Sequence, residues 1–368
     1  ASGLTAVEAL LPFGEGHRIG FVGPPTTGKS TAAQMLVAAQ SSKDTAVVYA
    51  AQRPRAALEA QLGRGGLLDN PNLTVVHADP NTDCLGARYL LPFCALHVAD
   101  QLRARHRHVL LVLDDLVAFG QAAAELGAPA PVTAAQAVAA ALDAAGAVES
   151  AEGGAQALTV AAVMDFDHED VELAPHLRDL WRSAEPSLDV CLAFDLRLAA
   201  DGVLPAIDAE RLLAAGPPPA YQAPLLRRLR AELLRFLATS RDRRERLDMC
   251  GQLGLHTEPQ DAEDAASARV ARALLAHAAG RTLPEVAVVM AAALVFHFPL
   301  YGRQPSRVAV AQFQEAVVAT VRDHHPRLWE ALQYLETTSD EEARATLAAL
   351  GQALLAHRFD FRLTRPEI

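Results

Sequence analysis

The sequence predicts an α/β domain built on a mostly parallel sheet, followed by an all-α helical bundle. Strand-like apolar runs alternate with helix-forming segments up to about residue 200, a pattern that favours parallel strands joined by helical crossovers. Beyond Pro224, leucines recur at helical spacing and no strand pattern is found. A glycine-containing loop between the first strand and the first helix predicts ligand chemistry at the carboxyl edge of the sheet. We therefore predict one domain over residues 1–220 and a second over residues 221–368.

The composition is that of a globular protein. Of its residues, 51% are apolar and 21% are charged, as in folded rather than disordered chains. Its length of 368 residues is enough for two or three domains with a sizeable core. The net charge of −11 argues against a direct nucleic-acid partner, because a polyanion needs a basic surface. No run of about 18 apolar residues occurs, so no transmembrane segment is predicted. The chain begins at Ala1 rather than Met, and we expect a processed or truncated product.

Cysteine usage favours a reducing compartment. The four cysteines are widely spaced and form no C-x-x-C pair; they are Cys84, Cys94, Cys191 and Cys250. This spacing predicts neither a zinc site nor a disulfide framework.

The segment GPPTTGKS, residues 23–30, fits the pattern G-x-x-x-x-G-K-[ST]. It follows an apolar run and precedes a helix-forming run, which is the strand–loop–helix context that the motif requires. Lys29 is expected to reach the outer phosphates of a nucleotide and the Ser30 hydroxyl to bind Mg²⁺. The alternative is a turn that binds no ligand. The expected phosphate-binding residues at this helix N-terminus are Gly23, Thr26, Thr27, Gly28, Lys29, Ser30 and Thr31.

The remaining elements of the first domain follow in order. After the first strand at residues 19–22, strands are predicted at residues 46–51, 73–78, 108–115, 158–166 and 188–198. Helices are predicted at residues 4–11, 31–40, 54–63 and 89–105. The weakly patterned segment 128–154 is interpreted as a loop-bearing insertion with a helix at residues 134–145.

The strand at residues 109–115 ends in the acid pair Asp114-Asp115. An apolar strand that ends in an acid delivers a carboxylate to the sheet edge. Asp114 is therefore expected to hold Mg²⁺ through water, as the corresponding Asp does in P-loop NTPases. The alternative is a solvated acid pair, which the loop at residues 23–30 makes the weaker interpretation.

The second domain carries helical patterns at residues 225–237, 262–279, 284–295, 308–324, 326–335 and 340–359. Eight arginines lie between Arg227 and Arg246. They indicate either a surface for an anionic partner or a solvated face with internal ion pairs, and the lack of interleaved aromatic residues favours the second. The pair His324-His325 predicts exposed imidazoles at a helix end, because adjacent helical residues point to different faces.

Taken in order, segments 7–18, 23–30, 48–53, 79–92, 113–116 and 202–208 resemble the α subunit of the F-type rotary ATP synthase. The resemblance implies a RecA-like domain that binds ATP or ADP with Mg²⁺. It implies partners, β-type subunits or other subunits of a large complex, and a position peripheral to a membrane through that complex. We expect the matrix face of the mitochondrial inner membrane, with a bacterial or plastid membrane periphery as the alternative.

Gln52 stands where the catalytic β-type subunits carry a Glu that activates water, and α-type subunits carry Gln there. A neutral amide can hydrogen-bond water or phosphate but cannot act as a general base. No other acid in the sequence is obviously placed for that task. With the resemblance, Gln52 predicts a nucleotide site without catalytic residues; the alternative is an ordinary polar residue at a strand end.

The sequence departs from the family at several positions. The arginine finger of the α subunits falls, counted without gaps, at Ala215, and Arg211 lies four residues too early. Leu204 replaces an Arg, while Ala279 and Arg281 replace two glutamines near the adenine ring. From the start at Ala1 we also expect that the barrel domain, which precedes this segment in the family, is absent. These departures predict a degenerate relative with a lost arginine finger and a less selective adenine pocket.

Three functions remain open from the sequence. The first is a non-catalytic nucleotide-binding subunit with a structural or regulatory role in a proton-transporting ATP synthase or a related assembly. The second is a stand-alone P-loop ATPase, because the loop also resembles that of AAA+ proteins. The third is a scaffold whose nucleotide pocket is empty.

Overall fold

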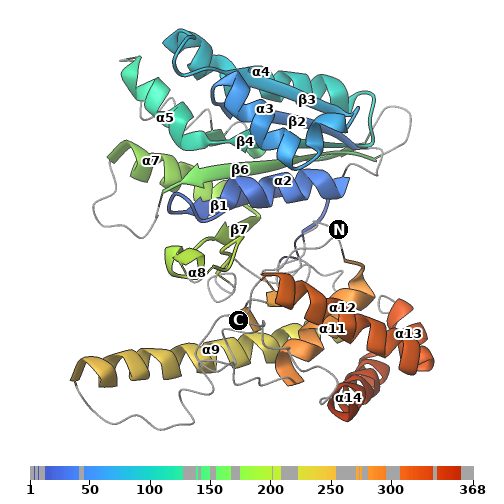
Figure 1. The fold of residues 1–368 in the computed structure, drawn as a ribbon. Helices are drawn as coiled ribbons and strands as arrows, with labels where there is room; N and C mark the ends of the chain where they lie inside the picture. Colours follow the sequence, from blue (N-terminus) through green and yellow to red (C-terminus); the bar gives the residue numbers. More distant parts are fainter. Residues whose placement is uncertain are drawn as a thin grey trace.

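The arrangement of the chain is known from a computed structural model. It describes residues 4, 7, 13–40, 45–126, 138–139, 142–149, 155–166, 175–200, 202–208, 223–253, 271–272, 274–275, 281–295, 307–334 and 338–357. Figure 1 shows a sheet with helices packed along it, and a group of C-terminal helices that contains no labelled strand. The predicted fold class, a RecA-like α/β domain followed by a helical region, is confirmed. The predicted boundary at residues 220 and 221 lies outside the described residues.

The sheet of the described residues has seven strands. Six of them are parallel and follow the order β3-β2-β4-β6-β1-β7. The seventh, β5, pairs with β6 in antiparallel orientation. The strands are β1 (Arg18–Gly23), β2 (Thr45–Gln52), β3 (Leu73–Ala78), β4 (His108–Asp114), β5 (Gly146–Glu149), β6 (Ala155–Asp165) and β7 (Val190–Ala193).

Both faces of the sheet are covered, and β2 shows why its sequence is apolar throughout. All eight of its residues are buried. Successive side chains of a strand point to opposite faces, so Val47 and Tyr49 lie in one apolar cluster, whereas Val48 lies in another. The first cluster includes side chains of α2 (Lys29–Gln40) and α3 (Arg55–Arg64). The second includes side chains of α4 (Leu85–Arg103), α5 (Leu116–Glu125) and α7 (Pro175–Ala184).

Several sequence predictions for the first domain were wrong. Helices α5 and α7 were not predicted, and β5 lies in the segment interpreted as a loop-bearing insertion. The apolar run 188–198 was predicted to be one strand, but it divides into β7 and the short helix α8 (Leu196–Ala200). The reason is Asp195, whose carboxylate accepts the backbone N–H groups of Arg197 and Leu198 and so starts a helix. Asp115 acts in the same way at α5, where it accepts the N–H of Ala118 at 2.7 Å.

The C-terminal helices surround α11, which is apolar along nearly its whole length. They are α9 (Pro224–Leu253), α11 (Leu283–Val295), α12 (Arg307–His324), α13 (Pro326–Gln333) and α14 (Asp340–Ala356). A helix that is apolar on all sides is stable only when neighbours cover it, and α11 contacts all four others. The predicted helices at 262–279 and 4–11 fall largely outside the described residues, and half of the predicted helix at 134–145 does so too.

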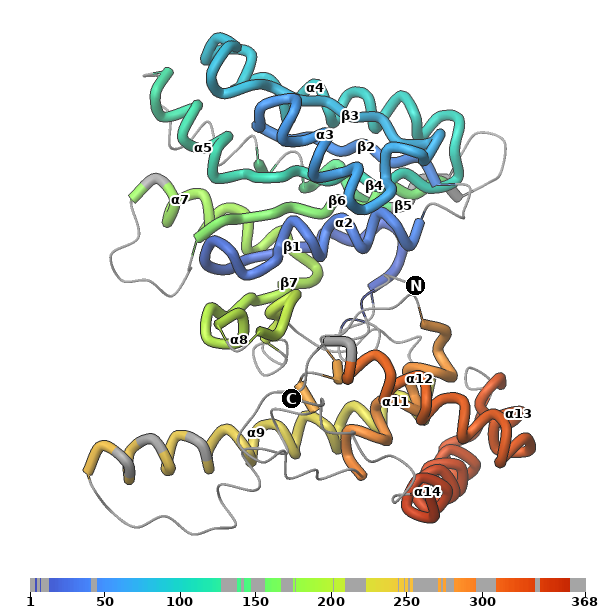
Figure 2. The backbone as a smooth tube through the Cα atoms, in the orientation of Figure 1, coloured from blue at the N-terminus to red at the C-terminus, as the bar shows by residue number. Residues whose placement is uncertain are grey.

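Helix α9 carries the eight arginines, and its C-terminal half extends away from the other labelled helices (Figure 2). Arg241 forms an ion pair with Glu245 one turn away at 2.9 Å. Arg227 and Arg228 both lie 3.7 Å from Asp340 at the start of α14. These contacts agree with a solvated face that forms ion pairs within the domain.

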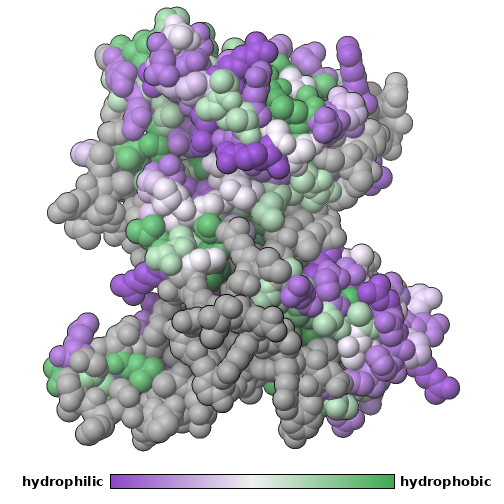
Figure 3. All heavy atoms as spheres, in the orientation of Figure 1, coloured by the Kyte–Doolittle hydropathy of each residue, from purple (hydrophilic) through white to green (hydrophobic). Residues whose placement is uncertain are grey.

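The visible face of the sheet domain carries apolar side chains in separate patches among hydrophilic ones (Figure 3). Leu68 and Leu90 are among the large apolar residues that remain about half exposed. Single exposed apolar residues are normal on protein surfaces. Among the helices of the described residues, none is long and apolar enough to cross a membrane.

Candidate functional site

The predicted phosphate loop, residues 23–30, connects the end of β1 to the start of α2. Glycine is required at two positions of this loop, for a different physical reason at each. A Cβ atom at Gly23 would lie 2.5 Å from the carbonyl oxygen of Phe194, so no side chain fits there. Gly28 has a φ of +87°, which side chains disfavour, and Leu204 and Pro205 lie directly against it. The loop is therefore packed against a second segment, residues 203–207.

Backbone hydrogen bonds hold this second segment in place. The N–H of Ala206 donates to the carbonyl of Thr27 at 3.0 Å, and the N–H of Asp195 donates to the carbonyl of Ala206 at 3.0 Å. The Thr27 side chain is fully buried, and its hydroxyl donates to the Pro24 carbonyl at 2.8 Å. Thr26 and Thr31, by contrast, are exposed. Of the three predicted threonines, Thr27 thus shapes the loop, whereas the other two are accessible to a ligand.

Lys29 is buried, with 3% of its side chain exposed. Its ammonium forms an ion pair with Asp165 Oδ1 at 2.6 Å. It also donates to the Pro24 carbonyl and, at 3.2 Å, to the Thr27 hydroxyl. A phosphate group that binds Lys29 must therefore replace Asp165, whose side chain is 39% exposed. The sequence analysis did not anticipate Asp165, the residue that ends β6, beside this loop.

Ser30 and Asp114, the two residues predicted to hold Mg²⁺, lie together. The Ser30 hydroxyl donates to Asp114 Oδ1 at 3.0 Å. Strands β2 and β4 are parallel neighbours, which brings side chains of β2 close to Asp114 at the end of β4. One of them is the buried Tyr49, whose hydroxyl donates to Asp114 Oδ2 at 2.7 Å. Arg53, just beyond β2, places Nη2 3.5 Å from Asp114 Oδ1. The Asp114 side chain is completely buried among these three partners.

These donors suit Mg²⁺, which prefers oxygen ligands. Because Ser30 directs its proton at Asp114, a cation at Ser30 would have to bind a lone pair of the hydroxyl oxygen. When bound at Ser30, Mg²⁺ would neutralise charge on the phosphates of a nucleotide. Arg53 complicates this arrangement, because its Nη2 also lies 3.3 Å from Ser30 Oγ.

Gln52 lies at the same sheet edge but is engaged by α4. Its Nε2 donates to the carbonyl of Arg88 at 3.0 Å, and its Oε1 accepts from Arg88 Nε at 3.3 Å. Both ends of the amide are therefore used by one residue. The contacts fit the alternative interpretation of Gln52 as a polar strand-end residue that joins β2 to α4.

Negative charge is concentrated at this edge. Burial is the main reason that the pKa of Asp115 is raised to about 6; the charges of Asp114 and Asp165 act in the same direction, and the hydrogen bond from the Ala118 N–H acts against them. Burial also raises the pKa of Tyr49 well above its usual value, with a contribution from Asp114. Tyr49 is therefore a neutral donor to Asp114 at physiological pH. Lys29 contacts Asp165, and Arg53 contacts Asp114.

Sequence reasoning missed three residues of this site: Tyr49, Arg53 and Asp165. Asp165 ends β6 much as Asp114 ends β4, and this similarity is a signal that could have identified it. Arg53 directly follows Gln52 and could have been considered with it. Tyr49 gave no signal, because an aromatic residue inside an apolar strand is usually part of the core.

The residues expected near the adenine ring do not form a pocket among the described residues. Arg281 is buried in the helical domain, where Nη2 donates to Gln314 Oε1 at 2.9 Å and pairs with Glu315 at 3.0 Å. Leu204 packs against the predicted phosphate loop at Gly28. Arg211, Ala215 and Ala279 lie outside the described residues.

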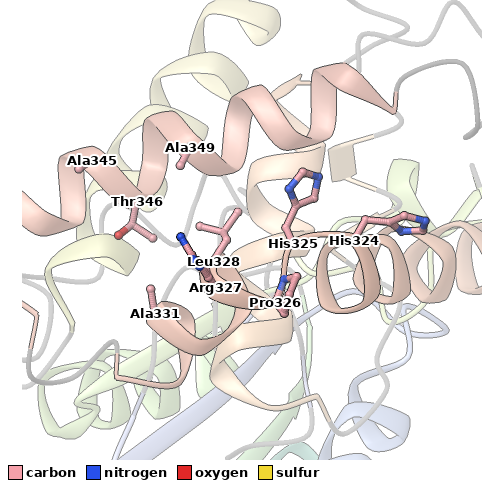
Figure 4. A pocket seen from close by; sticks show the side chains of 9 residues that line it. All are labelled: His324, His325, Pro326, Arg327, Leu328, Ala331, Ala345, Thr346 and Ala349. Atoms are coloured by element: carbon pink, nitrogen blue, oxygen red, sulfur yellow. The ribbon is translucent and has the colours of Figure 1, made fainter.

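A separate pocket of about 650 Å³ lies in the helical domain between α13 and α14. His324, His325 and Arg327 line it together with Thr346, and the two imidazoles point in different directions (Figure 4). The ring of His357 lies 5.1 Å from that of His324 and 5.5 Å from that of His325. No group of metal-ligating side chains with a suitable arrangement is found in the part of the chain that the structure describes.

The parallel sheet with helices on both faces and the helical region that follows it define a RecA-like α/β fold. The model of the ATP synthase alpha/beta family, nucleotide-binding domain, matches residues 3–213. The chain therefore belongs to the ATP synthase alpha/beta family.

Curated relatives place the chain near the alpha subunits of this family. It is 33% identical to ATP synthase subunit alpha 2 of Gluconobacter oxydans over 120 residues, and this aligned segment covers 31% of the chain and 23% of that protein. It is 35% identical over 128 residues to ATP synthase subunit alpha 1 of Dinoroseobacter shibae, covering 34% and 25%. The matched segment thus spans about a quarter of the length of these relatives. The chain is a divergent relative of the alpha subunits.

Proposed function

We propose that this chain is an α-type nucleotide-binding subunit that holds ATP or ADP with little or no turnover. The observation that carries the proposal is the meeting of Lys29, Ser30 and Asp114 at one sheet edge. A lysine, a hydroxyl and a carboxylate in this arrangement suit phosphates and their counter-charge. The match to the nucleotide-binding domain of the family supports the same function.

The lack of turnover is inferred from Gln52 and Asp165. Hydrolysis needs a group that takes a proton from the attacking water. Gln52 is neutral, and Arg88 engages both ends of its amide. Asp165 forms an ion pair with Lys29, the residue that is expected to bind the phosphates of the nucleotide.

Calorimetry with the purified chain tests the proposal. We expect ATP and ADP to bind, and Lys29→Ala to weaken binding by about a hundredfold or more, the scale of a lost charge-assisted phosphate contact. Turnover is expected to stay below about 1 s⁻¹, the low end of ordinary enzyme rates. No binding at millimolar nucleotide would refute nucleotide binding and favour the scaffold.

A stand-alone ATPase is the second candidate, and Asp165 is the observation that favours it. If nucleotide binding frees this carboxylate from Lys29, an acid becomes available beside the predicted phosphate loop. ATP turnover that is abolished by Asp165→Asn, with binding retained, would support this candidate against the non-catalytic one.

The partners and the location of the chain also belong to the proposal. Similarity to alpha subunits supports assembly with β-type subunits in a rotary ATP synthase or a related complex. Ala215 stands at the position of the family's arginine finger. We therefore expect that this chain supplies no arginine finger to the catalytic site of such a partner. Affinity purification of the tagged chain, followed by identification of co-purified subunits and of the membrane fraction, tests both the assembly and the expected mitochondrial or bacterial location.

A further inference from the structure

Arg53 is a cation at the predicted nucleotide site to which the proposed function gives no role. Its guanidinium is held at three points. Nη1 donates to Gln61 Oε1 on α3 at 3.1 Å. Nη2 donates to Ser30 Oγ at 3.3 Å and lies 3.5 Å from Asp114 Oδ1. The guanidinium is thus fixed from α3 on one side and from the sheet edge on the other.

The oxygens that Nη2 approaches are those predicted to organise Mg²⁺. A cation bound directly to Ser30 Oγ, at about 2.1 Å, would share that oxygen with the guanidinium. Two positive groups on one oxygen repel each other, and the buried position of Asp114 reduces the screening of that repulsion. Mg²⁺ at Ser30 and Arg53 in its present position therefore exclude each other.

Two of the carboxylates of the site are paired with cations of the chain itself, without a metal ion. Asp114 is paired with Arg53, and Asp165 is paired with Lys29. Asp115 adds a third carboxyl, whose side chain caps α5 by accepting the N–H of Ala118. In metal-dependent P-loop sites the divalent cation neutralises phosphate charge, and here a fixed guanidinium already stands beside Ser30.

We propose that Arg53 takes the place of the divalent cation, so that this chain binds a nucleoside triphosphate without Mg²⁺. The inference rests on the proposed function, because it concerns the same site. A guanidinium remains charged at all physiological pH values and has five N–H donors in a planar fork. While Nη2 stays on Ser30 and Asp114, its other donors can bind phosphate oxygens, as Arg does in many phosphate sites.

The test compares the dissociation constant of ATP in excess EDTA with that in saturating Mg²⁺, by calorimetry. For the unmodified chain we expect the two constants to agree within about threefold. Arg53→Gln removes the charge, and we expect it to weaken binding in EDTA by about tenfold or more while Mg²⁺ restores most of the affinity. Arg53→Lys keeps the charge and is expected to retain most of the binding in EDTA.

Arg55→Gln is the matched control, since Arg55 lies two residues away, is largely exposed and pairs only locally, with Glu59. It should leave both constants unchanged, and circular dichroism should show that all variants are folded. A tenfold or greater requirement for Mg²⁺ in the unmodified chain, on the scale of the effects above, would overturn this inference and leave the proposed function standing. An equal loss in both conditions for Arg53→Gln would also overturn it. Absence of ATP binding in either condition would refute the proposed function, and this inference with it.

Discussion

The carboxyl edge of the sheet and the core of the helical domain bury different kinds of side chain. At the sheet edge, Lys29 and Asp114 are buried among polar and charged partners. In the helical domain, α11 buries apolar side chains along nearly its whole length. Burying a charge costs free energy unless it is paired, whereas burying apolar area stabilises the fold. The comparison shows that the sheet edge buries paired polar groups, which a binding site needs, whereas the helical core buries apolar area, which stabilises the fold.

The largest effect is expected in the helical core. Leu229 on α9 is fully buried in the large apolar cluster. Leu229→Ala should lower the free energy of unfolding by about 2–5 kcal/mol, because it leaves a cavity, without changing nucleotide affinity. Denaturant unfolding and calorimetry measure the two quantities. Leu355→Ala, at a position 49% exposed, is the control and should change stability by less than about 0.5 kcal/mol.

The next prediction concerns nucleotide affinity, which Asp165→Asn is expected to raise. The substitution removes the carboxylate that pairs with Lys29, and under the proposed function that carboxylate competes with phosphate for the ammonium. Nucleotide affinity should rise by about tenfold, which corresponds to about 1.4 kcal/mol. Asp100→Asn, which removes an exposed ion pair with Arg103, should leave the affinity unchanged. A weaker affinity for Asp165→Asn would show that the carboxylate helps to hold the nucleotide.

Tyr49→Phe tests how much the hydrogen bond from Tyr49 to the buried Asp114 contributes to the stability of the fold. The substitution removes the hydroxyl that donates to Asp114 at 2.7 Å and leaves that carboxylate with one partner fewer. We expect the free energy of unfolding to fall by about 1–2 kcal/mol. Thermal and denaturant unfolding measure it. An unchanged stability would mean that this hydrogen bond contributes nothing net, and that the sheet edge tolerates an incompletely paired carboxylate.

The smallest effect is expected for thiol reactivity in the folded sheet domain. Burial raises the pKa of Cys191 to about 12, with a further contribution from Glu185. A thiol is protonated below its pKa, so Cys191 should remain unreactive toward iodoacetamide from pH 7 to about pH 9.5. Cys84 and Cys94 are exposed and should react throughout. Mass spectrometry of labelled peptides distinguishes them, and rapid labelling of Cys191 would indicate that the sheet domain opens more readily than its buried core suggests.

The sequence predicted the fold better than the boundaries of its elements. The strand at residues 73–78 and the helices near 284–295 and 308–324 were predicted to within a residue. The helix α5 was missed, because an alanine-rich apolar segment after a strand has no clear period. The split of residues 188–198 depends on one side chain, Asp195, whose capping hydrogen bonds a hydropathy pattern does not contain.

The sequence by itself determined the parts that depend on neighbouring residues: the glycines and Lys29 of the predicted phosphate loop, the acid that ends β4, and the change to helical periodicity after Pro224. Only the tertiary structure decided which distant side chains meet. It placed Asp165 on Lys29, Arg53 on Ser30 and Asp114, and Arg88 on Gln52. The physical reason is that the order of strands in the sheet brings the carboxyl ends of β1, β2, β4 and β6 to one edge, and no local pattern in the chain encodes that order.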